Sequence, residues 1–186
     1  VKLIADSGAT KAEWCLIKGN RKKTIFTQGI SPYFFTTQQI AEILQKELLP
    51  SLKGVQVNEV YYYGTGCINP NNVKIVKKAI AQVFGGLKKN EVTHDVMAAA
   101  RALYGDDKGV ACILGTGSSS CYYNGKKIAN NKPGLGYVLG DEGSGAYLGK
   151  KVLQYYLYQT FDEELMGRFK MKYNTPPASA ILENVY

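Results

Sequence analysis

Residues 1–11 read VKLIADSGATK, and the interpretation of the whole chain starts from them. An apolar, strand-like run ends in a turn that brings together the carboxylate of Asp6, the backbone of Gly8, the hydroxyl of Thr10 and the ammonium group of Lys11. Glycine lets a backbone approach an anion, successive N–H groups converge on phosphate oxygens, and a carboxylate can hold hydrated Mg²⁺. The stretch therefore suggests a phosphate and magnesium site, although a single hairpin turn of this composition is more often only a turn.

The pattern returns in residues 110–119, which read VACILGTGSS. A shift of 109 residues lays Gly117 on Gly8 and Ser119 on Thr10. Two equivalent hairpins, each with N–H and hydroxyl donors, can hold a triphosphate from opposite sides. The repeat therefore favours a polyphosphate site over two unrelated turns.

Hydrophobic periodicity predicts an α/β chain. Three strands come first, at residues 1–5, 13–18 and 23–28, with turn residues at Gly8 and at Lys18-Gly19-Asn20. Helices and strands then alternate: a helix that Thr36 or Thr37 caps and Pro50 ends, a strand at Glu59–Tyr63, a helix opened by Asn71 or Asn72, a strand at Glu91–His94, and an alanine-rich helix at Asp95–Tyr104. This order, βββαβαβα, forms one complete unit.

The second copy begins in the same way and then diverges. Its hairpin turns at Asn124-Gly125-Lys126, and a glycine-rich loop follows at Pro133–Gly145. Ser144 is expected to start a helix that runs to about residue 160, and a shorter helix is expected near Asp162–Lys172. The strand, helix, strand and helix that would complete a second unit do not follow.

Composition excludes several classes of function. The net charge of +8 comes from lysines in short, scattered clusters without interleaved aromatic residues. This pattern predicts solvated faces and no nucleic-acid partner. A basic surface would still attract an anionic nucleotide. The sequence shows no long apolar stretch and no cleavage signal, so we expect no membrane partner and a cytoplasmic location. The four cysteines are widely spaced, as is typical of cysteines that pack in a core.

Two common nucleotide-binding folds are disfavoured. The segment Gly149-Lys150-Lys151 lacks the spacing and the hydroxyl of a P-loop, and no Gly-x-Gly-x-x-Gly follows a strand, as a Rossmann fold requires.

Four segments together resemble one family: Ala5–Lys11, Thr93-His94-Asp95, Leu114–Ser119 and Gly140–Ser144. They are similar to motifs of the N-acetylglucosamine kinase and BadF/BadG/BcrA/BcrD-type ATPase family, within the actin, hexokinase and Hsp70 superfamily. The resemblance implies an actin-type ATPase fold of two ribonuclease-H-like domains with ATP in the cleft between them. Residues 1–108 would then form a complete N-terminal domain, and 109–186 the beginning of a second, truncated one.

The resemblance also implies a site. Asp95 would be the catalytic base, and Asp6 would lie near the metal ion. ATP phosphates would be bound by Gly8, Ala9, Thr10, Lys11, Gly115, Thr116, Gly117 and Ser118. The sugar would contact Asp95, Thr116, Gly136 and Asp141. The implied cofactors are ATP and Mg²⁺.

Structural roles compete with some of these assignments. From the residues alone, Asp95 is better explained as a helix cap, and only the family resemblance favours catalysis. Asp141 and Glu142 could equally serve the electrostatics of the following helix start. His94, the only histidine, is expected to be structural, because adjacent strand residues point to opposite faces.

The resulting hypothesis is an ATP-dependent kinase that transfers the γ-phosphate to a hydroxyl of an amino sugar such as N-acetylglucosamine or glucosamine. The exact sugar is left open, because Leu135 replaces a Trp of the animal kinases and Ser31-Pro32-Tyr33 lacks an Asn that the family uses near the sugar. The alternatives are an ATPase activator, a non-catalytic sugar or nucleotide sensor, and a filament-forming actin-like protein. In the activator ATPases of this family, a cysteine from each subunit of a dimer binds a cluster, and none of the four cysteines here is placed for that role. Whether the protein forms a homodimer is left open. In the family, the adenine-binding glycine motif lies in the later part of the second domain, at positions that would come after Tyr186.

Overall fold

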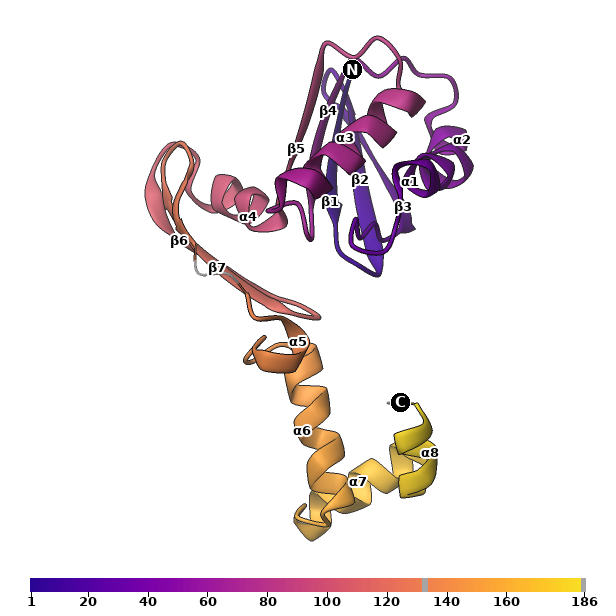
Figure 1. Cartoon of the computed structure of the whole chain (residues 1–186), viewed down its shortest axis with the longest axis vertical. Helices are drawn as coiled ribbons and strands as arrows, with labels where there is room; N and C mark the ends of the chain where they lie inside the picture. The colour runs from indigo at the N-terminus through magenta and orange to yellow at the C-terminus, as the bar shows by residue number, and fades with distance from the viewer. Residues whose placement is uncertain (132–133, 185–186) are drawn as a thin grey trace. The chain divides into compact units, whose positions relative to one another are not determined.

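The computed structural model describes residues 1–131 and 134–184, and it divides into two compact units. The first unit comprises residues 1–112 and 120–131, and the second comprises the described residues of 113–119 and 132–186. Figure 1 shows the elements of each. The predicted domain boundary after residue 108 stays a prediction, and Pro133 and Tyr186, which bound two of the predicted segments, lie outside the described residues.

The first unit is built on a five-stranded sheet in the order β3-β2-β1-β4-β5. Its strands are β1 (Lys2–Ser7), β2 (Lys11–Lys18), β3 (Arg21–Gln28), β4 (Glu59–Gly64) and β5 (Lys89–Thr93). Its helices are α1 (Thr37–Ile43), η1 (Leu44–Leu48), α2 (Leu49–Leu52), α3 (Pro70–Val83) and α4 (Asp95–Tyr104). Strands β1, β2 and β3 are antiparallel neighbours, whereas β1, β4 and β5 run parallel, so the predicted βββαβαβα order is confirmed.

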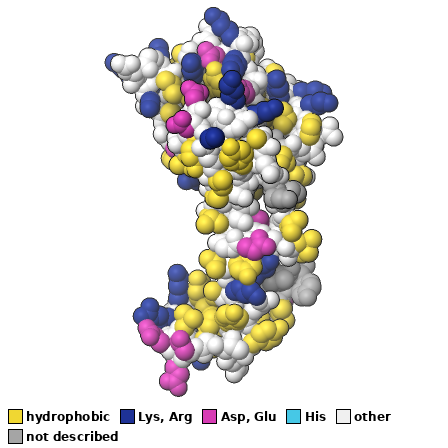
Figure 2. All heavy atoms as spheres, turned by 90° about the vertical axis from the view of Figure 1, so that its left-hand side faces the viewer, with side chains coloured by type: hydrophobic (Ala, Val, Ile, Leu, Met, Phe, Trp, Pro, Cys, Tyr) yellow, Lys and Arg dark blue, Asp and Glu magenta, His cyan; other side chains and the backbone are white. Residues whose placement is uncertain are grey.

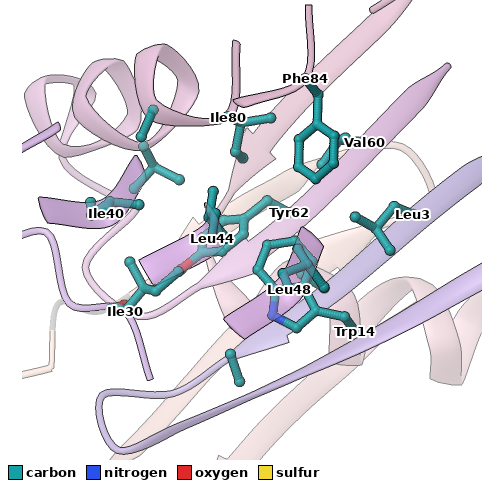
Figure 3. Close-up of a cluster of buried hydrophobic side chains, with 14 of the residues drawn as sticks. Leu3, Trp14, Ile30, Ile40, Leu44, Leu48, Val60, Tyr62, Ile80 and Phe84 are labelled. Carbon is teal, nitrogen blue, oxygen red and sulfur yellow. The ribbon is translucent and has the colours of Figure 1, made fainter. Parts of the chain in front are cut away.

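One face of this sheet forms the core. Because strand side chains alternate between faces, Leu3 on β1, Trp14 on β2 and Val60 and Tyr62 on β4 all point to the same side, where none of them is exposed. Figure 3 shows these residues together with apolar side chains from the helices that cover this face. The indole N–H of Trp14 donates a hydrogen bond of 3.0 Å to Thr27 Oγ1, which satisfies the one polar group that this ring buries.

Two helix boundaries differ from the predictions. The helix expected to end at Pro50 continues, because the π-helical turn Leu44–Leu48 is followed directly by α2. Pro50 lies in the first turn of α2, where a backbone N–H would have no partner within the helix, so its absence in proline costs nothing. Helix α3 begins earlier than predicted: Asn69 caps it by accepting the N–H of Asn71 at 2.9 Å. The predicted cap at Thr36 is confirmed, as a capping box with Gln39.

On the opposite face of the sheet, polar contacts fasten helix α4 to the strands. Arg101 on α4 donates to the hydroxyl of Tyr63 at 2.7 Å and to the carboxylate of Glu91 at 2.6 Å. Its guanidinium also lies 5.7 Å from the centre of the Tyr63 ring. These contacts hold α4 against β4 and β5, so they also hold the residue at its start, Asp95.

The remaining elements begin with a three-stranded sheet in the order β6-β7-β8, formed by β6 (Lys108–Leu114), β7 (Ser118–Asn124) and β8 (Ile128–Asn131). Four helices follow: α5 (Gly136–Leu139), α6 (Gly145–Leu157), α7 (Glu163–Tyr173) and α8 (Ala178–Glu183). Helices α6 and α7 were predicted, whereas α5 and α8 were not. Figure 2 shows hydrophobic side chains at the surface of the second unit, where Met171 is 80% exposed and Tyr158 76% exposed.

None of the described helices is both long and apolar enough to cross a membrane.

Candidate functional site

The first predicted phosphate turn joins β1 to β2. The N–H of Gly8 donates to the carbonyl of Lys11 at 2.9 Å and closes the turn. No acceptor among the described residues is found for the N–H groups of Ala9 and Thr10, and both residues are exposed. The turn therefore has two adjacent N–H groups available to an anion, and the binding of phosphate by them stays a prediction.

Asp6 lies one residue before the end of β1, on the face of the sheet that carries α4. Its cross-strand neighbours are Glu13 on β2 and Tyr63 on β4. Burial raises the pKa of Asp6, and the charges of Asp95 and Glu13 raise this pKa further. Asp6 is exposed to solvent, so partial desolvation and neighbouring negative charge act on its carboxylate together.

Asp95 lies at the carboxyl end of β5, as the first residue of α4. The helix cap is His94, which makes no side-chain capping bond, so the alternative prediction that Asp95 is the cap is wrong. The Asp95 carboxylate does accept the N–H of Val96 at 2.8 Å through Oδ1, which leaves Oδ2 free among the described contacts. A half-buried carboxylate with one oxygen held and the other free is able to accept a proton, and the role of Asp95 as the base stays a prediction.

Two side chains near Asp95, those of His94 and Cys67, are uncharged at neutral pH. Burial lowers the pKa of His94, with an opposing contribution from Asp95, so the imidazole is neutral at pH 7. Burial and the charge of Asp95 raise the pKa of the Cys67 thiol to about 12. Neither side chain therefore adds charge beside the carboxylates of Asp6 and Asp95. A neutral, half-buried imidazole fits the structural role expected for His94.

Lys11 starts β2 on the same face as Glu13 and Asp6. Its ammonium group lies 4.7 Å from the centre of the Phe26 ring, a cation–π contact at the surface. The side chain is exposed, and its predicted contact with phosphate stays a prediction.

In the second unit, the turn between β6 and β7 rests on the start of helix α6. The N–H of Gly145 donates to the carbonyl of Gly115 at 2.8 Å, and the N–H of Ala146 donates to the carbonyl of Thr116 at 3.1 Å. The Ser144 hydroxyl caps α6 by accepting the N–H of Tyr147 at 3.2 Å. The first donors of the helix are thus used to hold the turn, a support that no local sequence signal could have revealed.

Asp141 adds a second support to the same turn. Its Oδ1 accepts the N–H of Ser118 at 3.2 Å, and a Cβ added at Gly117 would lie 2.9 Å from its Oδ2. Asp141 has a left-handed backbone with φ of 60°, which is unusual for a residue other than glycine and is typical of functional loops. The N–H of Ser118 is therefore already bonded within the protein, while Thr116 and Gly117 lie next to it in the turn. Gly136, with φ of 72°, opens the short helix α5.

The structure brings part of the predicted site together within each unit: Asp6 with Asp95 in the first, and the turn at 115–118 with Asp141 in the second. The predicted grip on one triphosphate by both turns stays a prediction. Sequence reasoning missed Glu13, although the hairpin register that pairs it with Asp6 could have been drawn from the turn at Gly8.

The described residues suit a magnesium nucleotide. They contain no group of three or more His, Cys, Asp or Glu side chains able to enclose a metal ion. Mg²⁺ does not need such a group, because it is usually held by one or two carboxylates, water and substrate phosphates. Asp6 offers this arrangement, next to a turn with two N–H groups that have no acceptor within residues 1–131 and 134–184.

Comparison with known proteins gives the relationship. No family model matches the chain, and no curated protein sequence does. The structure matches that of a Porphyromonas gingivalis protein named "Putative N-acetylglucosamine Kinase", with a TM-score of 0.93 and 39% sequence identity. The match covers 100% of this chain and 66% of that protein, so the chain spans slightly less than two thirds of its length.

Two more distant structures share the fold. A Chromobacterium violaceum protein of the same name has a TM-score of 0.71 at 17% identity, over 98% of this chain and 67% of that one. The ROK hexokinase of Thermus thermophilus has a TM-score of 0.54 at 14% identity, over 88% and 70% of the respective chains. These likenesses support an actin-like, ribonuclease-H-type α/β fold. The chain is therefore similar over its whole length to a protein named "Putative N-acetylglucosamine Kinase", and it has an actin-like ATPase fold.

Proposed function

We propose that this protein is an ATP-dependent sugar kinase that transfers the γ-phosphate to a hydroxyl of an amino sugar. One observation carries the proposal: two carboxylates, Asp6 and Asp95, lie close enough to influence each other beside a turn with unpaired N–H groups. The name of the Porphyromonas gingivalis relative supports the same substrate class.

Each residue would have a separate role. Asp95, oriented by the N–H of Val96, would accept the proton of the sugar hydroxyl as its oxygen attacks the γ-phosphorus. Asp6 would hold the hydrated Mg²⁺, whose charge, when bound, stabilises the negative charge on the transferred phosphate. The N–H groups of Ala9 and Thr10 would bind phosphate oxygens.

The second turn would complete the grip on the nucleotide. The N–H groups of Thr116 and Gly117 would face the phosphates, and the hydroxyl of Thr116 would also contact the sugar. Asp141 and Gly136 would contribute to the sugar site, and for Asp141 this role would come in addition to its bond with Ser118. Closure around both substrates would exclude water and limit hydrolysis of ATP.

The test is release of ADP, measured with a coupled assay, on a panel of N-acetylglucosamine, glucosamine, N-acetylmannosamine and glucose. We expect release that depends on Mg²⁺ and is fastest with an amino sugar. Binding of ATP and sugar without ADP release would instead identify a sensor, and hydrolysis that no sugar stimulates would identify an ATPase. A cytoplasmic location and a homodimer stay predictions.

A further inference from the structure

The first phosphate turn is in backbone contact with a residue from another part of the chain, Gly29. This residue directly follows β3 and is buried. A Cβ added at Gly29 would lie 2.4 Å from the carbonyl carbon of Ala9, 2.5 Å from its oxygen and 2.5 Å from the oxygen of Gly8. All three are backbone atoms, so no rotation of a side chain could relieve the overlap.

This contact bears on the direction of an N–H group. The carbonyl oxygen of Gly8 points toward Gly29, and in a planar trans peptide the C=O and the following N–H point in opposite directions. The N–H of Ala9 is therefore directed away from Gly29. It is one of the two turn donors that have no acceptor among the described residues.

Buried hydrogen bonds prevent the segment around Gly29 from moving aside. The N–H of Ile30 donates to the hydroxyl of Ser7 at 3.2 Å, and the hydroxyl of Tyr62 donates to the carbonyl of Ile30 at 3.4 Å. Ser7, Ile30 and Tyr62 are each 0% exposed. These bonds tie the segment to the ends of β1 and β4, so a side chain at position 29 would displace the turn.

We propose that Gly29 is a positioning residue for phosphate binding: the absence of a side chain there sets the backbone of Gly8 and Ala9 so that the Ala9 N–H faces the nucleotide. The proposal rests on the proposed function, because it assumes that the turn binds phosphate. It adds a residue 20 positions away from Ala9 in the chain that never touches the ligand itself.

The test compares Gly29→Ala with Gly85→Ala. A Cβ at Gly85 meets nothing within 4 Å, and the backbone there is not left-handed, so this control changes composition alone. Amide NMR spectra of the ligand-free proteins should show displaced signals for Ala9 and Thr10 in Gly29→Ala and unchanged signals in Gly85→Ala. Calorimetry with Mg-ATP should show affinity reduced by about 10- to 100-fold in Gly29→Ala only, as expected when a hydrogen bond to a charged phosphate oxygen is lost.

A second variant covers the case in which Gly29→Ala does not fold. Tyr62→Phe keeps the ring and removes the hydroxyl that holds Ile30. It should raise the KM for ATP several-fold while leaving the KM for the sugar unchanged, a split that a loss of stability alone would not produce.

The outcomes separate the two proposals. If the unmodified chain binds Mg-ATP and Gly29→Ala binds it equally well with unmoved amide signals, the positioning role is refuted and the proposed function survives. If Gly29→Ala fails to fold and Tyr62→Phe leaves both KM values unchanged, the positioning role is likewise refuted. If the unmodified chain does not bind Mg-ATP, the proposed function fails, and the positioning role fails with it.

Discussion

Burial and the neighbouring carboxylate of Asp95 together raise the pKa of Asp6. The two residues lie far apart in the sequence of the first unit, Asp6 near the end of β1 and Asp95 at the start of α4. Their mutual repulsion opposes full ionisation in the folded protein, and a hydrated cation beside Asp6 would remove that repulsion. The following predictions concern this relationship, its surroundings and the second turn.

Asp6→Asn should stabilise the metal-free protein at neutral pH. A folded-state pKa above the ordinary value of 3.8 means that ionisation of Asp6 opposes folding, so its contribution is most favourable below that value and is lost as pH rises through the raised pKa. The variant should therefore melt at a higher temperature than the unmodified protein at pH 7, and the difference should vanish as pH falls below 3.8. Thermal unfolding followed by circular dichroism measures this. A lower melting temperature at pH 7 would contradict it.

Asp95→Asn should reduce kcat by about 10²–10⁴-fold while leaving nucleotide affinity nearly intact, because only proton transfer is removed. The Asn side chain still offers an oxygen to the N–H of Val96, so the start of α4 should keep its structure. Steady-state kinetics and calorimetry give the two quantities. Asp106→Asn, at an exposed position, is the matched control and should behave as the unmodified protein. Unchanged turnover in Asp95→Asn would remove this residue from the mechanism.

Gly117→Val should abolish ATP binding. Side-chain atoms there would block the approach of a phosphate, and the Cβ alone would lie 2.9 Å from Asp141 Oδ2 and force the turn or that carboxylate to move. Gly149→Ala is the control from the same unit, since a Cβ there meets nothing within 4 Å and alanine favours the helix by about 1 kcal/mol. Calorimetry showing normal affinity in Gly117→Val would refute a phosphate role for the second turn.

His94 should titrate below its ordinary pKa of 6.5, because burial outweighs the opposing effect of Asp95. The chain has one histidine, so NMR should show a single imidazole titration. Asp95→Asn should lower the pKa of His94 further. Since the folded-state pKa is depressed, this histidine's contribution to stability is complete above pH 6.5 and is lost as pH falls through the folded-state pKa. A pKa above 6.5 would show that Asp95, and not burial, dominates.

Thr27→Val should destabilise the first unit by about 1–3 kcal/mol, because the buried indole N–H of Trp14 would lose its acceptor. Thr27→Ser keeps the hydroxyl and should lose less. Urea unfolding followed by the fluorescence of the chain's one tryptophan measures both. A larger loss in Thr27→Ser than in Thr27→Val would show that the methyl group of Thr27, and not its hydroxyl, matters.

Prediction from sequence was most accurate where structure depends on near neighbours. The alternation that buries Leu3 and exposes Lys2, and the cap at Thr36, need only a few adjacent residues. It was wrong at Pro50, since whether proline ends a helix or starts a new turn depends on the π-helical turn before it. It also missed helix α8, which follows Pro177 without a capping side chain.

By itself, the sequence determined the strands, the polar turns at residues 6–11 and 115–119, and the family resemblance, because each is encoded by residues close together in the chain. Only the tertiary structure decided that Asp95 lies near Asp6, that Asp141 bonds to Ser118, and that Gly29 lies against Ala9. These contacts join residues from different strands and helices. Their distances follow from how the sheet and its helices pack, which no short stretch of sequence specifies.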